Sequence, residues 1–489
     1  MGLVESVARV RLRQSTLSAA RAGTELPRYR RESCAVGIVH FGPGAFHRAH
    51  QAFYVDRLLG DDPRWGIAAV SLQSPATRDA LAPQDGLYTL AEIGAQTAYR
   101  VIGSLLELRH APQESAAVLA RLTAPTTRIV TLTVTEKGYC LGTDSRLDPR
   151  HPDIAHDLGQ PGSPRSVIGY LAEGLRRRRS LGIDPFAVVS CDNLPDNGAT
   201  LRAAVTAFAE RIDAGLAAWL AEQVAFPRTM VDSITPATDE AFRQRVLEFT
   251  GLEDAWPVRR ESFTQWVIED LPAVRVADWS AAGVTLARDV SLYDRAKLRL
   301  VNGAHSSLAY IGLLRGHETV AGAMSDRGLS EFVERLMRLD ILPSLQGAPE
   351  LDLDTYIPAV LERFRNPGTR HRLSQIAWDG SQKLPVRLMG TIEEAHRAGR
   401  PLHRLLLPVA AWMRFIARQA KAGVAIVDPL AEPLVAIGQA CTGDAVADVA
   451  SFVGLGAVLP QQLLAVREVR SALEQAYGLM GSPQDALPQ

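Results

Sequence analysis

The stretch Val36-Gly37-Ile38-Val39-His40-Phe41-Gly42-Pro43-Gly44-Ala45-Phe46 decides the fold of the first half of the chain. Its first six residues are mostly β-branched or aromatic, which predicts a short strand, and the following glycines predict a tight turn. Without side chains at Gly42 and Gly44, backbone N–H groups of such a turn can approach a pyrophosphate at the start of a helix. A Gly-x-Gly pattern alone fits a structural turn equally well, and His47 stands where a third glycine is usual.

Further β-rich runs alternate with helical patterns on the C-terminal side of this stretch. The predicted strands cover Trp65–Leu72, Arg128–Val134 and Ala187–Ser190, and the predicted helices cover Ser166–Arg179 and Leu201–Gln223. Buried strands that alternate with helices indicate a mostly parallel sheet covered on both faces. This half of the chain is therefore predicted to be an α/β domain.

The pattern becomes helical after about residue 285. Helices are predicted over 296–314, 329–339, 355–365, 401–422 and 460–477, separated by proline and glycine. The chain has 489 residues, which favours two domains. We predict a poorly ordered N-terminal extension over 1–31, a dinucleotide-binding α/β domain over 32–285 and a mainly α-helical substrate-binding and catalytic domain over 286–489.

Composition narrows the class of protein. The net charge of −1 argues against a bulk attraction to nucleic acid or to an anionic membrane. The four cysteines are scattered without a Cys-x-x-Cys pair, which is typical of a reducing cytoplasm. No run approaches the roughly 18 apolar residues that a membrane span requires. We expect a cytoplasmic protein with a small-molecule partner, as a monomer or weak homo-oligomer.

The end of the second predicted strand bears on the choice between NAD and NADP. An acidic residue there would bind the adenosine ribose hydroxyls and repel a 2′-phosphate. Ser74 and Arg78 stand in this segment instead. NAD is the expected cofactor, NADP stays open, and Arg78 fits a solvated helix residue equally well.

A second motif, Lys297 to His305, lies in a helical context. At 100° per residue, Asn302 lies about 140° and His305 about 80° around the helix from Lys297. A lysine with a lowered pKa can exchange a proton with an alcohol or ketone, and Asn and His donors can stabilise a developing alkoxide. A lysine at this spacing is also a common solvated surface residue.

Several segments together resemble the mannitol dehydrogenase and fructuronate reductase family of polyol and hexuronate dehydrogenases. These are GPGAFHRAHQAFYVDRLL (42–59), SCDNLPDNG (190–198), FPRTMVD (226–232), QWVIED (265–270), KLRLVNGAH (297–305) and DGSQKLP (379–385). They follow the family order. The resemblance implies a Rossmann-type N-terminal domain, a helical C-terminal domain and zinc-free catalysis between them.

The resemblance also implies roles for individual residues. Lys297 resembles the catalytic acid/base, Asn302 and His305 the groups that polarise the reacting oxygen, and Asn193 a further polar group beside the reacting carbon. Asp232 and Lys383 resemble substrate contacts. The candidate cofactor-binding residues are Phe41, Gly42, Gly44, Ala45 and Phe46.

The chain departs from the family pattern at a few positions near these motifs. Ser233 and Thr264 stand where relatives commonly have Arg, and Asp294 stands where some mannitol-type relatives have Glu. These departures alter polar contacts near the predicted cleft. None of them removes a predicted catalytic group.

Charge near the motifs favours a sugar acid as substrate. Lys137 stands in the TEKGYC segment where mannitol-type relatives tend to have Gly, and its cation can pair with a carboxylate. Gln375 replaces an Arg of the mannitol type, and the loop Arg370-His371-Arg372 offers further anion ligands, Arg372 among them, although a solvated loop fits that triplet as well. We therefore expect reversible reduction of D-fructuronate to D-mannonate.

Other functions are weighed against this hypothesis. Oxidation of a polyol such as D-mannitol or D-arabinitol keeps the same fold and chemistry. A metal-dependent enzyme would need three or four convergent ligands, and the spacing of His47 and His50 offers no distinctive set, so no metal is expected. A non-catalytic nucleotide-binding protein would predict decay of the Lys297, Asn302 and His305 set, which is intact.

Overall fold

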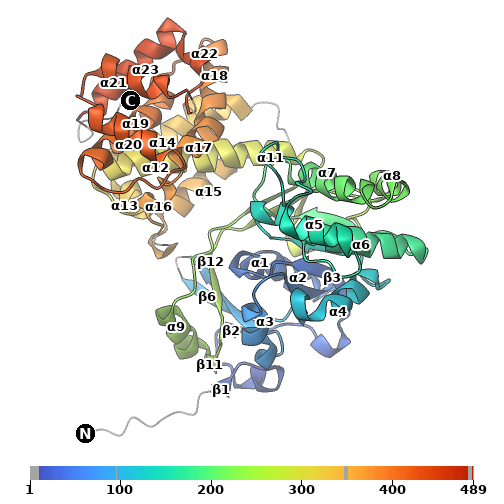
Figure 1. The fold of residues 1–489 in the computed structure, drawn as a ribbon. Helices are drawn as coiled ribbons and strands as arrows, with labels where there is room; N and C mark the ends of the chain where they lie inside the picture. The colour runs from blue at the N-terminus through green and yellow to red at the C-terminus, as the bar shows by residue number, and fades with distance from the viewer. Residues whose placement is uncertain are drawn as a thin grey trace, which may run out of the picture. The chain divides into compact units, whose positions relative to one another are not determined.

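The computed structural model describes residues 10–94, 96–345, 351–369, 371–456, 458–482 and 487. The chain divides into two compact units, Met1–Val290 and Ser291–Gln489, here called unit 1 and unit 2 (Figure 1). Sequence patterns had predicted this division at residue 285. Each unit has its own layers and core.

A parallel sheet of five strands forms the centre of unit 1. Its strands lie in the order β7-β4-β3-β8-β9, and all four pairings are parallel. The strands are β3 (Val36–Phe41), β4 (Gly66–Ser71), β7 (Leu105–His110), β8 (Ile129–Leu132) and β9 (Ala187–Ser190). In chain order this is the 3-2-1-4-5 arrangement of a Rossmann-type sheet, whose switch point lies between β3 and β8. The predicted α/β class and its parallel strands are confirmed.

Both faces of this sheet are covered, because alternate side chains of a strand point to opposite faces. Val39 and Phe41 of β3 belong to one buried core, together with helices α4, α6 and α7. Ile38 belongs to a second core with α2 and α10. All six residues of β3 are buried, which explains why apolar residues occur on both of its faces instead of alternating with exposed polar ones.

Among its described residues, unit 1 has three further, smaller sheets. Their strand orders are β12-β5-β6-β2, β10-β13-β14 and β1-β11. The strands are β1 (Val10–Arg11), β2 (Thr24–Glu25), β5 (Tyr88–Ile93), β6 (Thr97–Ile102), β10 (Thr229–Asp232), β11 (Leu252–Glu253), β12 (Val258–Glu261), β13 (Gln265–Glu269) and β14 (Thr285–Ala287). Sequence patterns did not predict them, because most are short and several mix buried apolar residues with Glu and Arg.

The helices of unit 1 connect and cover these strands. They are α1 (Ala45–Ala49), α2 (Gln51–Leu58), α3 (Ala76–Leu81), α4 (Ala111–Thr123), α5 (Pro152–Gly159), α6 (Val167–Ser180), α7 (Asn197–Glu210), α8 (Ala214–Gln223), α9 (Glu240–Thr250) and α10 (Trp279–Ala282). The predicted helix over 201–223 is two helices. Asp213 separates them, because its side chain caps α8 by accepting from the N–H of Gly215.

The prediction of a poorly ordered N-terminal extension is wrong for residues 10–31, which belong to the fold of unit 1. β1 pairs with β11 and β2 pairs with β6. Arg31 donates to the carbonyls of Gly103 and Leu105 at 2.8 and 2.9 Å. These long-range bonds order a segment whose arginine-rich sequence gave no strand or helix pattern. Residues 1–9 lie outside the described residues.

Unit 2 is built from helices, as predicted. They are α12 (Gly303–Leu314), α13 (Val320–Ser325), α14 (Arg327–Arg335), α15 (Leu353–Arg365), α16 (Leu373–Ile376), α17 (Gly380–Leu384), α18 (Gly390–Arg397), α19 (His403–Lys421), α20 (Ala431–Ala440), α21 (Ala445–Gly454), α22 (Gln461–Leu464) and α23 (Arg467–Leu479), and α11 (Val290–Ala296) precedes them. The long helix α19 packs against α12, α20 and α23. In the described part of the chain, no helix is both long enough and apolar enough to cross a bilayer.

In the described part of unit 2, three π-helical turns interrupt the helices at Lys297–Asn302, Leu336–Ile341 and Pro385–Met389. They converge at Gly303, where a Cβ would lie 3.4 Å from the Arg387 carbonyl oxygen and 3.9 Å from Ile341 Cδ1. A regular α-helix was expected over 296–314, so the first π-turn corrects that expectation. π-turns occur frequently at functional sites.

We predict that Arg31→Met lowers the free energy of unfolding by about 2–4 kcal/mol, because carbonyls in partly buried positions lose charged donors. Arg30→Met is the matched control, since Arg30 is exposed; it should change stability by less than about 0.5 kcal/mol. Urea unfolding measures both. Equal stability of the two variants would show that residues 10–31 are not integral to unit 1.

Candidate active site

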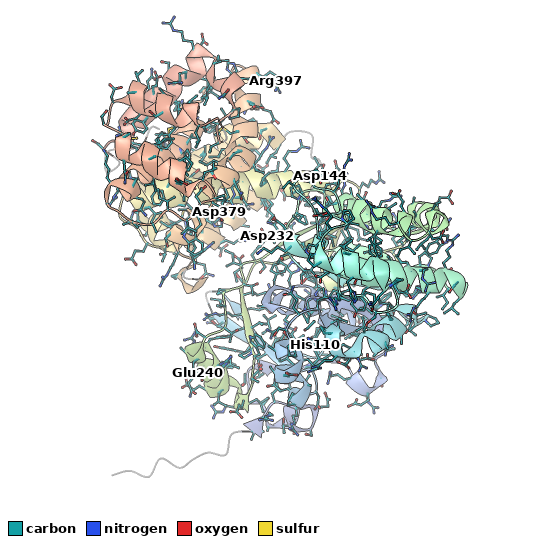
Figure 2. The ribbon with its side chains drawn as sticks, in the orientation of Figure 1. His110, Asp144, Asp232, Glu240, Asp379 and Arg397 are labelled. Carbon is teal, nitrogen blue, oxygen red and sulfur yellow. The ribbon has the colours of Figure 1, made fainter. Side chains whose placement is uncertain are left out.

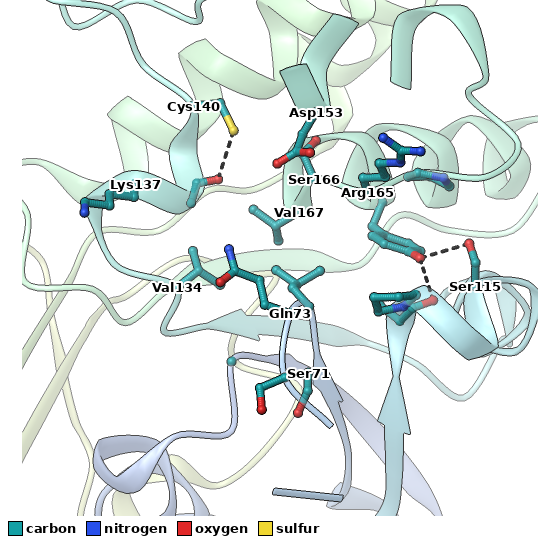
Figure 3. Close-up of a pocket in the computed structure, with 18 of the residues that line it drawn as sticks. Ser71, Gln73, Ser115, Val134, Lys137, Cys140, Asp153, Arg165, Ser166 and Val167 are labelled. Carbon is teal, nitrogen blue, oxygen red and sulfur yellow. Dashed lines mark hydrogen bonds between the residues drawn. The ribbon is translucent and has the colours of Figure 1, made fainter. Parts of the chain in front are cut away.

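A large cavity of unit 1 lies at the switch point of the parallel sheet. Its volume is about 1160 Å³, and the segments after β3, β4 and β8 line it together with residues of the α5–α6 connection. Figure 3 shows this cavity, with Lys137 at one end in this view and Ser115 and Arg165 at the other. Ligand sites of drug-sized molecules measure roughly 300–1,000 Å³, so the cavity suits a longer ligand such as a dinucleotide.

The two glycines after β3 have different physical roles. Gly42 has a φ of 87°, and a Cβ there would lie 2.2 Å from the Thr133 carbonyl oxygen. Gly44 has an ordinary φ of −70°, and the nearest atom to its Cβ would be the Gly42 oxygen at 3.9 Å. Gly42 therefore allows the turn to pass against β8, while Gly44 keeps the cavity wall open.

The start of α1 fits an anionic group in this cavity. Gly44 is the N-cap of α1, and it has no side chain that could accept from the first N–H groups of the helix. Such groups are the usual ligands of a pyrophosphate. Of the predicted cofactor-binding residues, Gly42 and Gly44 line the cavity, whereas Phe41, Ala45 and Phe46 are not part of its lining.

Two stacked histidine rings pack beside the turn that follows β3. The His40 ring lies 3.3 Å from the His47 ring, centroid to centroid. His40 donates through Nε2 to the Gly42 carbonyl at 3.2 Å, and its Nδ1 accepts from the Thr131 hydroxyl at 2.8 Å. Burial lowers the pKa of His40 to about 3, so the ring stays neutral. His47 thus fills, by ring stacking, the position where a third glycine was expected.

The part of the cavity wall at the carboxyl end of β4 contains polar side chains but no acidic side chain. Ser71, Gln73, Ser74 and Thr77 line it. Arg78 does not; its guanidinium contacts Asp79 at 2.8 Å and Glu114 at 3.5 Å. Arg78 was the cation that left NADP as an alternative cofactor in the sequence analysis. In the structure it is already paired with two carboxylates.

A smaller cavity of about 370 Å³ adjoins the first one at the end of β8. Thr135, Glu136, Lys137, Asp192, Asn193 and Leu194 line it, and Thr135 and Lys137 line both cavities. The structure thus brings two predicted site residues, Lys137 and Asn193, to one small cavity. Both of these side chains are exposed.

Asp192 fixes the two segments that present these residues. Its carboxylate accepts from the N–H groups of Thr135 and Val134 at 2.8 and 3.2 Å and from the Tyr139 hydroxyl at 3.0 Å. Burial raises the pKa of Asp192, and these bonds oppose the rise. Thr135 has a φ of 63°, a strained value for a β-branched residue. Sequence analysis assigned no role to Asp192 and missed this bracing role.

Asp232 is the last residue of β10 and is 7% exposed; Figure 2 labels it. The two positions that depart from the family pattern nearby make local contacts. The Ser233 hydroxyl donates to the Phe263 carbonyl at 3.0 Å, and Thr264 accepts from Tyr54 at 3.4 Å.

Lys297, Asn302 and His305 follow one another on a continuous helical path in unit 2. Lys297 and Asn302 are the ends of the first π-turn, in which the Gly303 N–H donates to the Leu298 carbonyl, five residues earlier. Closing a turn over five residues brings positions i and i+5 closer around the axis than in an α-helix. The separation of about 140° expected between Lys297 and Asn302 is therefore an overestimate, and the π-turn aligns the two side chains better.

His305 is buried at the start of α12. Burial, followed by the neighbouring His371 and arginines, lowers its pKa well below the ordinary value, so the ring is neutral. Its Nε2 has no hydrogen-bond partner among the described residues. A neutral imidazole with a free ring nitrogen can donate a hydrogen bond to a substrate oxygen.

The loop that holds His371 and Arg372 pairs with the segment around Thr319. Val320 donates to the His371 carbonyl and Leu373 donates to the Glu318 carbonyl, both at 2.9 Å. Successive side chains of an extended segment point to opposite sides. His371 accordingly contacts His305, with ring centroids 5.2 Å apart, while Arg372 lines a different cavity of about 770 Å³. Substrate binding by Arg372 stays a prediction, and Arg370 lies outside the described residues.

In the DGSQKLP segment, Gly380 serves close packing and Lys383 supplies a basic side chain. A Cβ at Gly380 would lie 2.6 Å from Trp412 Nε1 and 2.6 Å from the Tyr310 hydroxyl, so only glycine fits there. The Lys383 ammonium donates to the Trp378 carbonyl at 2.6 Å and lies 3.9 Å from Asp379, which Figure 2 labels. Burial lowers the pKa of Lys383. Its position is thereby fixed by α16 and α17.

Sequence reasoning missed two arginines near His305, of which Arg363 is buried and Arg387 is half-buried. Arg363 lies on the buried face of α15, three residues after Val360. Arg387 donates to the Ser306 hydroxyl at 3.0 Å and to the Asn302 carbonyl at 3.5 Å. The detectable signal was an arginine on the apolar stripe of a helix, since long charged residues are rarely buried without a role.

The histidines considered as metal ligands have other contacts. His47 stacks on His40, and His50 donates through Nε2 to the Gln265 carbonyl at 2.9 Å. Within the described ranges, no group of three His, Cys, Asp or Glu side chains is placed to hold a metal ion. Metal-independent catalysis stays a prediction.

Comparisons with known proteins agree with this geometry. The family model of the mannitol dehydrogenase Rossmann domain matches residues 36–279, and that of the mannitol dehydrogenase C-terminal domain matches residues 289–477. D-mannonate oxidoreductase of Escherichia coli (strain K12) is 41% identical over 452 residues, which cover 90% of this chain and 92% of that protein. Mannitol 2-dehydrogenase of Phaeosphaeria nodorum is 41% identical over 420 residues, covering 84% and 74%. The solved ternary complex of Pseudomonas fluorescens mannitol 2-dehydrogenase with NAD and D-mannitol shares 37% identity, a TM-score of 0.79 and 97% coverage of both chains.

The two glycines give a matched pair of variants. Gly42→Ala should lower the free energy of unfolding by about 2–4 kcal/mol, because it adds backbone strain and a clash with Thr133. Gly44→Ala should change stability by less than about 1 kcal/mol, yet raise the Kd for NADH on the order of tenfold, since a methyl group then occupies space at the cavity wall. Urea unfolding and NADH fluorescence titration separate the two effects. Wild-type NADH affinity in Gly44→Ala would refute the cofactor position.

Proposed function

The chain belongs to the mannitol dehydrogenase family, and we propose that it is an NAD-dependent, metal-independent enzyme that interconverts D-mannonate and D-fructuronate. The coarser statement is established: the protein is an oxidoreductase that acts on CH–OH groups and takes a nicotinamide cofactor and a small polyol or sugar substrate. The proposal concerns the sugar acid, the choice of NAD and the residues that act.

The preference for a sugar acid rests most on the cavity that Lys137 shares with Asn193. Asn193 is the proposed polar group beside the reacting carbon, so a cation on the same cavity favours an anionic substrate over a neutral one. Lys137 is exposed, and an exposed ion pair is worth only about 0.2–1 kcal/mol. The expected contribution of Lys137 is therefore modest.

The preference for NAD rests on the state of Arg78. Its guanidinium is held by Asp79 and Glu114, and a 2′-phosphate would bring additional negative charge close to both carboxylates. The hydroxyl and amide groups of Ser71, Gln73 and Ser74 line the cavity there and suit neutral ribose hydroxyls. Gly42 and Gly44 are the proposed contacts of the pyrophosphate.

In the proposed mechanism, residues of unit 2 transfer one proton and donate two hydrogen bonds to the reacting oxygen. When bound, the nicotinamide supplies the hydride in reduction and accepts it in oxidation. In reduction, the Lys297 ammonium gives its proton to the oxygen of the keto carbon; in oxidation, the neutral amine takes the hydroxyl proton. Asn302 and His305 donate hydrogen bonds to that oxygen and stabilise the negative charge that develops on it. Asp232 and Lys383 are proposed contacts of the other substrate hydroxyls.

Oxidation of a polyol is the second candidate function. The mannitol 2-dehydrogenase of Phaeosphaeria nodorum is as similar as the D-mannonate oxidoreductase, at 41% identity each. D-Mannitol and D-arabinitol would use the same cofactor and the same Lys297 chemistry. A non-catalytic nucleotide-binding protein is disfavoured because Lys297, Asn302 and His305 are all retained.

The proposal predicts that D-mannonate gives a higher kcat/KM than D-mannitol and D-arabinitol with NAD, and that NADP supports slower turnover. Initial rates of NADH or NADPH formation test this directly. Lys137→Gly should lower kcat/KM for D-mannonate by about two- to fivefold and leave the polyol rates unchanged. Faster turnover of a polyol by the wild-type protein would refute the sugar-acid assignment, and equal losses on both substrates would refute the role of Lys137.

A further inference from the structure

A buried amide side chain joins two candidate site segments of unit 1. Asn197 is the first residue of α7 and is 2% exposed. The segment just before it carries Asn193, the proposed polar group beside the reacting carbon. Strand β10 ends at Asp232, the proposed substrate contact. Asn197 forms hydrogen bonds with both of these segments, although they are distant in the chain.

The amide of Asn197 forms a bridge between the edges of two sheets. β9 is the last strand of the five-stranded sheet, and β10 is an edge strand of a different sheet. Asn197 Nδ2 donates to the Asp192 carbonyl, just after β9, and to the Thr229 carbonyl, at the start of β10, both at 3.0 Å. Its Oδ1 accepts from the Thr229 N–H at 3.1 Å. The side chain thus pairs with Thr229 as a residue of a neighbouring strand would, and it ties Thr229 to the end of β9.

The Thr229 side chain strengthens the same link. Its hydroxyl donates to the Ser190 carbonyl and accepts from Asn197 Nδ2 at 3.2 Å. Thr229 and Asn197 are both 2% exposed, so removal of either partner leaves buried polar groups unsatisfied. The ion pair between Arg228 and Asp196 joins the same segments at 2.6 Å, but both of its side chains are exposed, and such a pair contributes little. The buried amide is therefore the stronger polar link.

Gly198 explains how this amide comes within reach of β10. A Cβ at Gly198 would lie 2.6 Å from the Phe226 carbonyl oxygen and 2.8 Å from that of Pro227. Only glycine lets the start of α7 approach the segment that leads into β10. The SCDNLPDNG and FPRTMVD segments of the sequence thus pack against each other through Asn197 and Gly198.

We propose that Asn197 is a positioning residue for the reaction, because it sets the place of Asn193 relative to Asp232. This inference rests on the roles proposed for those two residues. Asn193 directly follows Asp192, whose carbonyl accepts from Asn197. β10 has four residues, from Thr229 to Asp232, and its pairing with β13 keeps it extended, so a shift at Thr229 displaces Asp232 as well. Asn197 lines neither cavity, yet a misplacement of about 1 Å at a reacting group lowers a rate on the order of 100-fold.

The test compares Asn197→Ala with Gln84→Ala, a matched control. Gln84 is another buried amide of unit 1 that lines neither cavity. Its Nε2 donates to the Leu87 carbonyl at 2.9 Å and to the Asp254 carboxylate at 3.0 Å, and its Oε1 accepts from the Ala255 N–H at 2.6 Å. Each variant loses a hydrogen-bonded buried amide, so urea unfolding should show similar losses of stability.

Kinetics and binding, measured under conditions where both variants are folded, should then separate them. Asn197→Ala should lower kcat/KM for the sugar on the order of 10- to 100-fold. Its Kd for NADH should stay within about threefold of the wild-type value, because β3 and β8 hold the Gly42 turn. The kinetic isotope effect of a substrate deuterated at the reacting carbon should rise, since hydride transfer becomes the slow step. Gln84→Ala should keep the wild-type kcat/KM, Kd and isotope effect.

Two variants of Thr229 keep the test valid if Asn197→Ala does not fold. Thr229→Val removes the hydroxyl at nearly constant volume, and it should lower kcat/KM about three- to tenfold, the effect of one buried hydrogen bond. Thr229→Ser retains the hydroxyl and should stay within about twofold of the wild-type value.

The sugar used is whichever of D-mannonate and D-mannitol the wild-type protein oxidises faster, so failure of the sugar-acid assignment leaves this test intact. Asn193→Ala and Asp232→Ala test the roles on which the inference rests, and wild-type activity of both would refute those roles and the inference together. Low activity of these two variants, beside a wild-type kcat/KM in Asn197→Ala and Thr229→Val, would overturn the positioning role alone. Equal losses of kcat/KM in Asn197→Ala and Gln84→Ala would also overturn it, because the effect would then be one of stability.

Discussion

The close approach of the Gly42 turn to the Thr133 carbonyl is the contact on which the rest of unit 1 depends. A Cβ at Gly42 would lie 2.2 Å from that oxygen, so only glycine lets the end of β3 meet the end of β8. These two strands border the switch point of the sheet, where crossover helices leave to opposite faces and a cavity must form. The neutral His40 bonds to both Gly42 and Thr131 and holds this junction. The cavity, the start of α1 and the presentation of Lys137 all follow from the junction.

Unit 2 is organised around a different constraint, the placement of several half-buried basic side chains in one region. The π-turns at Lys297–Asn302 and Pro385–Met389 bring Lys297, Asn302 and Arg387 to one region, and Gly303 permits their contact. Arg387 is anchored by Ser306, and Lys383 by the Trp378 carbonyl. Keeping charged groups partly out of water lowers stability unless they are hydrogen-bonded.

Much of the fold could be predicted because local patterns and tertiary packing agree in the central strands. β3, β4, β8 and β9 are buried and apolar, and they were found at nearly their observed bounds. β5 and β12 were not, because they contain charged residues beside the apolar ones, and their pairing joins residues such as Leu90 and Val258 that are distant in the chain. The order of residues 10–31 depends on the same kind of long-range bond.

The candidate site was predictable to the same degree. Gly42, Gly44, Lys137 and Asn193 line adjoining cavities because they follow parallel strands, whose carboxyl ends meet at one edge. The helical wheel placed Lys297 and Asn302 less well, since a π-turn leaves no plain sequence pattern. Which of His371 and Arg372 lies beside His305 could not be predicted, because the side on which each side chain lies depends on pairing with Glu318–Val320.

The central claim is that Lys297 exchanges the proton with the reacting oxygen. The most direct measurement is kcat of Lys297→Ala, with and without added methylamine, beside its Kd for NADH. The account predicts a kcat lower by on the order of 10²- to 10⁴-fold, partial recovery with the amine and an unchanged Kd. A variant that keeps kcat close to the wild-type value would contradict the account.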